Sequence, residues 1–147
     1  MRFDFENEPQ PDALLRIEPA LGGQSHLSED DYIEGPPELI VEVAASSAAY
    51  DLHEKLRVYR RNGVQEYLVL LAYEQETRWF QLVEGEYKLL QPDEAGILQS
   101  QVFPGLHFQP DFFRSDNLAE LLKVLQAGLA TSDHEAFIAA LQARQTK

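Results

Sequence analysis

Two apolar runs separated by an amphipathic segment dominate the hydrophobic pattern between residues 39 and 72. Residues 39–44 read Leu-Ile-Val-Glu-Val-Ala, so that apolar side chains surround a single carboxylate, Glu42. A run of this kind is typical of a strand that is covered on both faces. Residues 66–72 form a second strongly apolar run. A strand, a helix and another strand predict a right-handed crossover that joins two parallel strands.

The segment between these runs has the period of a short amphipathic helix, residues 52–61. Asp51 is predicted as its N-cap, with Glu54 three residues later in the sequence. At 100° per residue, one arc of the helix is apolar; it contains Leu52, Leu56, Val58 and Tyr59. Lys55 falls inside this apolar arc, although the solvent side had room for it.

The remaining pattern predicts short strands and two C-terminal helices. We expect a strand at residues 13–17, a hairpin of residues 78–83 and 87–90, an edge strand at 97–103, and helices at 118–128 and 132–145, the last opened by Ser132. Together these elements predict an α/β protein with one domain over residues 1–147. Its core covers residues 9–110 and its helical tail residues 116–147.

Composition agrees with a globular chain and excludes several classes of protein. The chain has 147 residues, of which 44% are hydrophobic, and it contains no cysteine for a disulfide or a thiolate metal site. No apolar stretch approaches the roughly 20 residues that span a bilayer. The first residues turn acidic immediately, which predicts that there is no signal peptide. We therefore expect a cytoplasmic protein.

The net charge of −13 opposes binding to a nucleic-acid backbone unless a local basic patch or a metal ion intervenes. The densest basic cluster is Arg57, Arg60 and Arg61, on the predicted solvent side of the helix. Two interpretations stay open for these arginines: they solubilise an exposed face, or they contact DNA.

Lys55 and Glu42 are two charges at positions where an apolar residue would fit better. A buried lysine costs free energy unless a negative partner meets it, and Glu42 on the preceding strand is such a partner. Misplaced charges on consecutive elements indicate a functional site. The alternative is a buried structural ion pair, or a lysine whose ammonium reaches past the edge of the helix to water.

Other catalytic chemistries lack their motifs. The four histidines have no metal-ligand spacing, there is no phosphate-binding glycine loop, and Ser46 and Ser47 have no G-x-S-x-G context. We expect the two serines to cap the turn after the strand. Carboxylates remain: Asp12 and Glu42 could hold Mg²⁺, with Lys55 orienting or deprotonating the attacking water. Taken alone, Asp12 also fits a simple turn residue.

A series of motifs in order resembles one known family. These motifs are Pro11-Asp12, the segment 37–47 with Glu42 and Ser46-Ser47, then Asp51, Lys55 and Tyr59, and then Gly63-Val64-Gln65-Glu66-Tyr67-Leu68. Over residues 9–110 the chain resembles the bacterial putative restriction endonuclease family of the PD-(D/E)xK nuclease superfamily. The resemblance implies a restriction-endonuclease-like mixed sheet flanked by helices, and a metal-dependent DNA endonuclease. It implies Asp12 and Glu42 as ligands of Mg²⁺ or Mn²⁺, and Lys55 as the superfamily lysine moved onto the following helix.

The resemblance has two departures. Ala44 stands where the superfamily usually has its lysine, two positions after the glutamate. Family members also commonly carry an N-terminal region with a further acidic residue. An alternative function is therefore a catalytically inactive nuclease-fold domain that acts through protein–protein contacts. Because double-strand cleavage by small domains needs two active sites, we also expect a homodimer with twofold symmetry.

Overall fold

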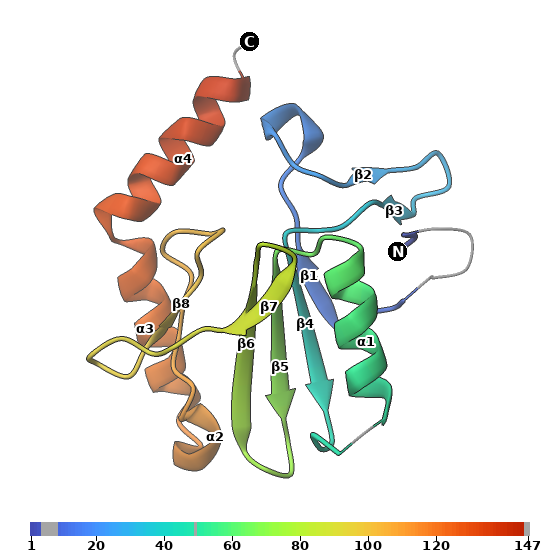
Figure 1. The fold of residues 1–147 in the computed structure, drawn as a ribbon. Helices are drawn as coiled ribbons and strands as arrows, with labels where there is room; N and C mark the ends of the chain where they lie inside the picture. The colour runs from blue at the N-terminus through green and yellow to red at the C-terminus, as the bar shows by residue number, and fades with distance from the viewer. Residues whose placement is uncertain (4–8, 49, 146–147) are drawn as a thin grey trace.

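A five-stranded mixed sheet forms the centre of the molecule (Figure 1). The structure is a computed structural model that describes residues 1–3, 9–48 and 50–145. The strand order is β1 (Ala13–Leu15), β4 (Leu39–Ala44), β5 (Glu66–Leu71), β6 (Glu76–Val83) and β7 (Glu86–Leu89). β4 and β5 are parallel, and the other neighbours are antiparallel. This arrangement confirms the predicted α/β class and the parallel pairing across the crossover.

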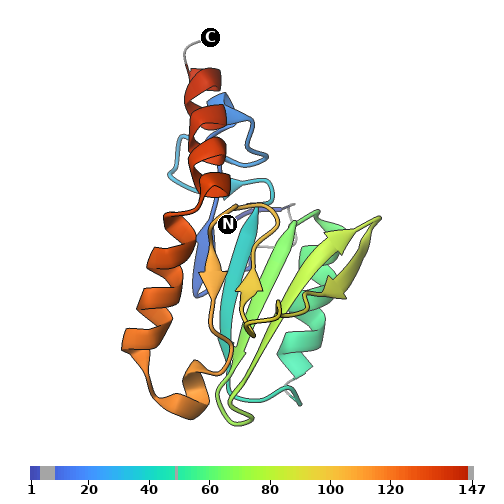
Figure 2. The same cartoon turned by 90° about the vertical axis from the view of Figure 1, so that its left-hand side faces the viewer.

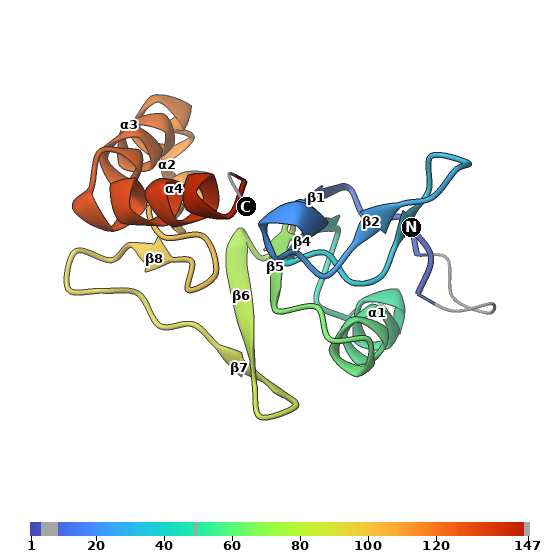
Figure 3. The ribbon, with the colours of Figure 1, turned by 90° about the horizontal axis from the view of Figure 1, so that it is seen from above.

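The helix of that crossover, α1 (Tyr50–Arg61), packs on one face of the sheet (Figure 3). Its buried Leu52 and Tyr59 join Ile40, Tyr67 and other residues of β4 and β5 in one apolar core. The contact follows from the apolar arc of α1 and the alternation of side chains along β4.

The opposite face of the sheet is covered by a small hairpin and by the C-terminal helices (Figure 3). The hairpin pairs β8 (Leu98–Gln99) with β9 (His107–Phe108), and β9 contacts α3 (Leu118–Leu129). Trp79, Leu39, Leu68 and Leu98 form the second core between these layers. Val43, near the end of β4 on this face, is 57% exposed, so the prediction that β4 is covered on both faces fails at its C-terminal end.

The remaining elements are short, apart from the C-terminal helix. They are the 3₁₀ helix η1 (Pro19–Leu21), the hairpin of β2 (His26–Leu27) and β3 (Ile33–Glu34), the short α2 (Phe112–Ser115), and α4 (Ser132–Gln145). In Figure 2, α4 continues from α3 toward the loop that contains η1. There Arg144 donates a hydrogen bond of 2.6 Å to the Leu21 carbonyl oxygen. None of the described helices is long and apolar enough to cross a bilayer.

Two strand predictions are too long, and buried glutamates explain both. The predicted strand 13–17 ends at Leu15, because the Ile17 N–H donates to the carboxylate of Glu38 at 2.7 Å. The predicted edge strand 97–103 pairs only at residues 98–99, in the separate β8–β9 hairpin. The N–H of residue 100 still donates to the Leu106 carbonyl oxygen, but the N–H groups of residues 101 and 102 donate to the carboxylate of Glu66. In both places a side chain takes the hydrogen bonds that a strand would need.

Two residues that were predicted as helix caps, Asp51 and Ser132, lie inside their helices. α1 begins at Tyr50, so Asp51 lies inside the first turn, and its side chain is outside the described part of the structure. At the start of α4, the hydroxyl of Thr131 accepts from the His134 N–H at 3.3 Å. Thr131 therefore takes the role that was predicted for Ser132.

Candidate functional site

Glu42 lies on the face of β4 that α1 covers, together with Ile40 and Ala44. Only 5% of the residue is exposed, which confirms that Glu42 does not point into bulk solvent. Burying a carboxylate in an apolar core costs free energy unless partners compensate its charge and its lone pairs. The partners of this carboxylate therefore decide what the site can do.

Both carboxylate oxygens of Glu42 have a partner on α1. Lys55 donates from Nζ to Oε2 at 3.1 Å, and Tyr59 donates from its hydroxyl to Oε1 at 2.7 Å. The predicted ion pair between Glu42 and Lys55 is thus present. The side chain of Lys55 is 27% exposed, so its stem lies along the core while the ammonium keeps some contact with water.

Helical spacing explains why Lys55 and Tyr59 meet the same carboxylate. Residues four apart lie on one face of a helix, one turn above the other. Tyr59 is fully buried, and its ring makes edge contacts with Phe3 and Tyr67 at centroid distances of 6.1 and 5.0 Å. The apolar arc of α1 therefore includes its two polar groups because both of them face Glu42.

A cavity of about 180 Å³ opens beside this ion pair. Its lining comprises Glu42, Val43, Ala44, Ala45, Leu52, Lys55 and Tyr67. Ala44, which stands at the usual lysine position of the superfamily, and Lys55 border the same space. A lysine on α1 can therefore serve the cavity that a lysine at position 44 would serve from the strand.

Asp12 directly precedes β1, at the edge of the sheet next to β4. The pairing of Ala13 with Val41, continued by one residue, sets Asp12 opposite Glu42. The exposed carboxylate of Asp12 accepts from the Val43 N–H at 2.7 Å through Oδ2. The structure therefore brings the two predicted acids to adjacent strands, although Asp12 is not among the residues that line the cavity of Glu42.

The pair of acids suits a metal site with few protein ligands. Oδ1 of Asp12 has no hydrogen-bond partner among the described residues, and Glu42 lines a cavity. Mg²⁺ commonly takes one or two carboxylates and keeps several waters. Within the described ranges, no three or more aspartate, glutamate or histidine side chains converge as metal ligands. A site here would depend on these two carboxylates together with water and substrate.

The serines after β4 have a role that the sequence did not predict. Ser46 Oγ accepts from the Ala48 N–H at 3.1 Å, as a turn cap does. Both hydroxyls and the Ser47 N–H also donate to Oε1 of Glu74, at 3.2, 2.7 and 2.8 Å. These bonds, from the Ser47 side chain first, lower the pKa of Glu74 to about 2. The serines therefore tie the loop after β4 to the turn between β5 and β6.

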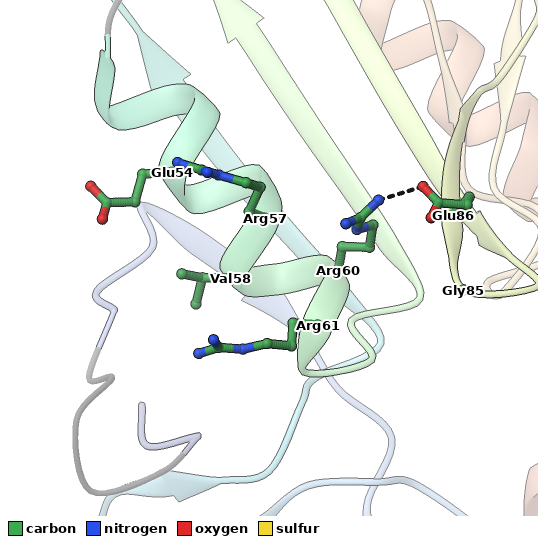
Figure 4. A pocket seen from close by; sticks show the side chains of 7 residues that line it. All are labelled: Glu54, Arg57, Val58, Arg60, Arg61, Gly85 and Glu86. Atoms are coloured by element: carbon green, nitrogen blue, oxygen red, sulfur yellow. Dashed lines mark hydrogen bonds and ion pairs between the residues drawn. The ribbon is translucent and has the colours of Figure 1, made fainter.

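The arginine cluster lines a separate groove of about 780 Å³ (Figure 4). Its walls are Glu54, Arg57, Val58, Arg60, Arg61, Gly85 and Glu86. Arg60 forms an ion pair with Glu86 across the groove, whereas Arg57 reaches along the outside of α1. Arg57 follows Lys55 by two residues, a rotation of about 200°, so the groove and the Glu42 cavity lie on different sides of the helix.

Comparison with known proteins identifies a family for most of the chain. A sequence model described as putative restriction endonuclease, Uma2, matches residues 1–111. This family belongs to the restriction-endonuclease-like superfamily. The matched range contains the whole five-stranded sheet, α1, Asp12, Glu42 and Lys55, and it ends just before α2. No curated protein matches the chain significantly.

Proposed function

The chain belongs to the putative restriction endonuclease family, and from this premise we propose that it is a metal-dependent DNA endonuclease that hydrolyses phosphodiester bonds. One observation carries the proposal beyond the family description. A buried glutamate and a lysine from the next helix are in contact at the wall of an open cavity. Charges in such positions are typical of functional sites, because packing alone would favour apolar residues.

Asp12 and Glu42 are the residues that would hold the metal ion, Mg²⁺ or Mn²⁺. Glu42 lies on β4 and Asp12 directly precedes the neighbouring strand β1, and their carboxylates supply the oxygen ligands that these ions prefer. When bound, such an ion polarises the phosphoryl oxygens and lowers the pKa of the attacking water. It would also offset part of the −13 net charge where the DNA backbone approaches.

Lys55 is the proposed group that contacts the scissile phosphate or orients the attacking water. Its ion pair with Glu42 stabilises the ammonium form, which attracts a phosphate oxygen. Its partial exposure leaves the ammonium reachable from the cavity. The wall of that cavity also includes the apolar residues Leu52 and Ala44.

A nicking assay on supercoiled DNA with Mg²⁺ or Mn²⁺ tests this role. We expect wild-type protein to nick the DNA only with metal, and Lys55→Ala to nick it about 100-fold more slowly, the range of one positioned catalytic group. Lys88→Ala, which changes an exposed lysine on β7, is the matched control and should act like wild type. Equal cleavage by wild type and Lys55→Ala would remove Lys55 from the mechanism.

The second candidate is a non-catalytic domain that acts through protein contacts. Its support is α3, which lies outside the matched range and exposes Leu118 and Leu122 to solvent at 61% and 48%. Calorimetry separates the two functions. Loss of a Mn²⁺ site in Asp12→Asn favours the nuclease, and absence of any binding at millimolar Mg²⁺ or Mn²⁺ favours the non-catalytic domain.

A further inference from the structure

The Glu42 carboxylate is held at two points, and only one of them is a charge. Lys55 engages Oε2 and is partly solvated, whereas Tyr59 engages Oε1 from a fully buried position. The tyrosine bond is also the shorter of the two, at 2.7 Å against 3.1 Å. A flexible, partly solvated lysine restrains a partner less than a side chain with two torsions in a packed core.

The ring of Tyr59 has little freedom to move. Phe3 and Tyr67 contact it edge-on, and Tyr67 in turn lies against Phe80 and Tyr87. Aromatic pairs at these distances stabilise a defined orientation of the rings. The Tyr59 hydroxyl is therefore a donor at a fixed point of the core, beside Oε1 of Glu42.

We propose that Tyr59 is a positioning residue, which orients the Glu42 carboxylate for metal binding through the hydrogen bond to Oε1. The inference rests on the proposed function, because it assigns Tyr59 to the same site. A carboxylate that binds a metal ion needs a fixed orientation, and hydrogen bonds from outside the ligand set supply it. Tyr59 itself touches neither the metal ion nor the substrate.

The proposal also accounts for a lysine on the helix instead of the strand. Position 44 lies on the same strand as Glu42, two residues further, and could supply one charge. Lys55 and Tyr59, one helical turn apart, supply a charge and a neutral donor to the two oxygens of one carboxylate. The helix position therefore couples the charge of the site to the orientation of its ligand.

Manganese titration calorimetry on the full chain tests the proposal with a matched pair of variants. Tyr59→Phe removes the hydroxyl that meets Glu42. Tyr87→Phe removes the hydroxyl that donates to the Val64 carbonyl oxygen at 2.9 Å, in the same aromatic cluster. Each variant loses one hydrogen bond from a tyrosine, and thermal unfolding checks that both remain folded.

We expect Tyr59→Phe to bind Mn²⁺ at least about 10-fold more weakly than wild type, the usual cost of losing a bond that orients a metal ligand. Tyr87→Phe should lose thermal stability but keep the wild-type affinity. Equal affinities of Tyr59→Phe and wild type, or equal losses in both variants, would overturn the positioning role alone. A wild-type chain that binds no Mn²⁺ would overturn the proposed metal site, and the role of Tyr59 with it.

Discussion

At the scale of single residues, Glu42 and Lys55 occupy positions that stability alone would give to apolar side chains. Their neighbours Ile40, Leu52 and Tyr67 form the core on this face of the sheet. An ion pair that loses solvation on both sides gains little net stability, whereas removal of one partner leaves the other uncompensated. The two substitutions are therefore expected to interact.

We predict that Glu42→Leu combined with Lys55→Met unfolds at a temperature no lower than Glu42→Leu alone. Loss of Glu42 removes one partner of Lys55 and one of Tyr59, and should cost about 1–3 kcal/mol. The partly exposed ammonium recovers some of this through water. Thermal unfolding of both single variants and the double variant at neutral pH measures the interaction. Strictly additive losses would contradict it.

A second prediction at this scale concerns the contribution of Glu74 to the stability of the fold at acidic pH. Hydrogen bonds from Ser47 and Ser46 lower its pKa from the unfolded value of 4.5 to about 2. The folded state therefore binds this proton less readily, so the bonds contribute stability above pH 4.5 that is lost as pH falls toward 2. We expect the melting temperature of Glu74→Gln to fall less steeply than that of the wild type between pH 4.5 and about 2. An unchanged decline would show that Glu74 does not contribute to it.

At the scale of elements, α1 presents different chemistry on its two sides. Its inner side holds Glu42 through Lys55 and Tyr59, and its outer side lines the arginine groove. Four of the twelve basic residues of the chain lie within residues 55–61. In a protein with a net charge of −13, this is the segment where a phosphate backbone meets the least repulsion.

The sequence left open whether these arginines contact DNA, and Arg57 provides the test. If it contacts a phosphate, Arg57→Gln should weaken DNA binding and reduce the slope of log affinity against log salt by about 1. Lys123→Gln, on α3 beside Glu120, is the control and should leave the slope unchanged. Fluorescence anisotropy over a salt series measures both. Unchanged binding in Arg57→Gln would support the interpretation of a solvated face.

The sequence predicts the elements whose signal is local and misses those that distant side chains decide. The bounds of β4 match the prediction, and those of β5 and α1 agree within two residues, because each has a clear apolar period. The ends of β1 and β8 depend on the carboxylates of Glu38 and Glu66, which lie 21 and about 35 residues away in the sequence. No pattern within a strand reports such a contact.

The same division holds for the candidate site. The contact of Glu42 with Lys55 was predictable, because each charge interrupts an apolar pattern. The apolar pattern gave no such signal for Tyr59, since a tyrosine in an apolar arc is typical of packing; only the family motif singled it out. Its hydrogen bond follows only from the four-residue spacing to Lys55 once the strand and helix are in place. Likewise, the bonds of Ser46 and Ser47 to Glu74 cross from one loop to another.

At the scale of the whole molecule, we predict a homodimer. Two copies would provide the two active sites that double-strand cleavage requires, and twofold symmetry is the commonest assembly. The exposed Leu118 and Leu122 of α3 give one apolar surface for such a contact. Light scattering should give twice the 16.7 kDa of one chain. A mass of one chain across a wide concentration range would rule the dimer out.

The contact between α4 and the loop of η1 joins residues outside the family match to residues inside it. The region that matches the family ends at residue 111. Beyond it, Arg144 donates a hydrogen bond to the Leu21 carbonyl oxygen, and the ring of Phe137 packs edge-on against Phe103 with 6.2 Å between the centroids. His134 is likewise bonded to the Pro104 carbonyl oxygen. Residues after 111 thus contact two loops that belong to the shared region. We therefore expect that a fragment of this protein folds on its own only when it extends through α4, beyond the residues that the family shares.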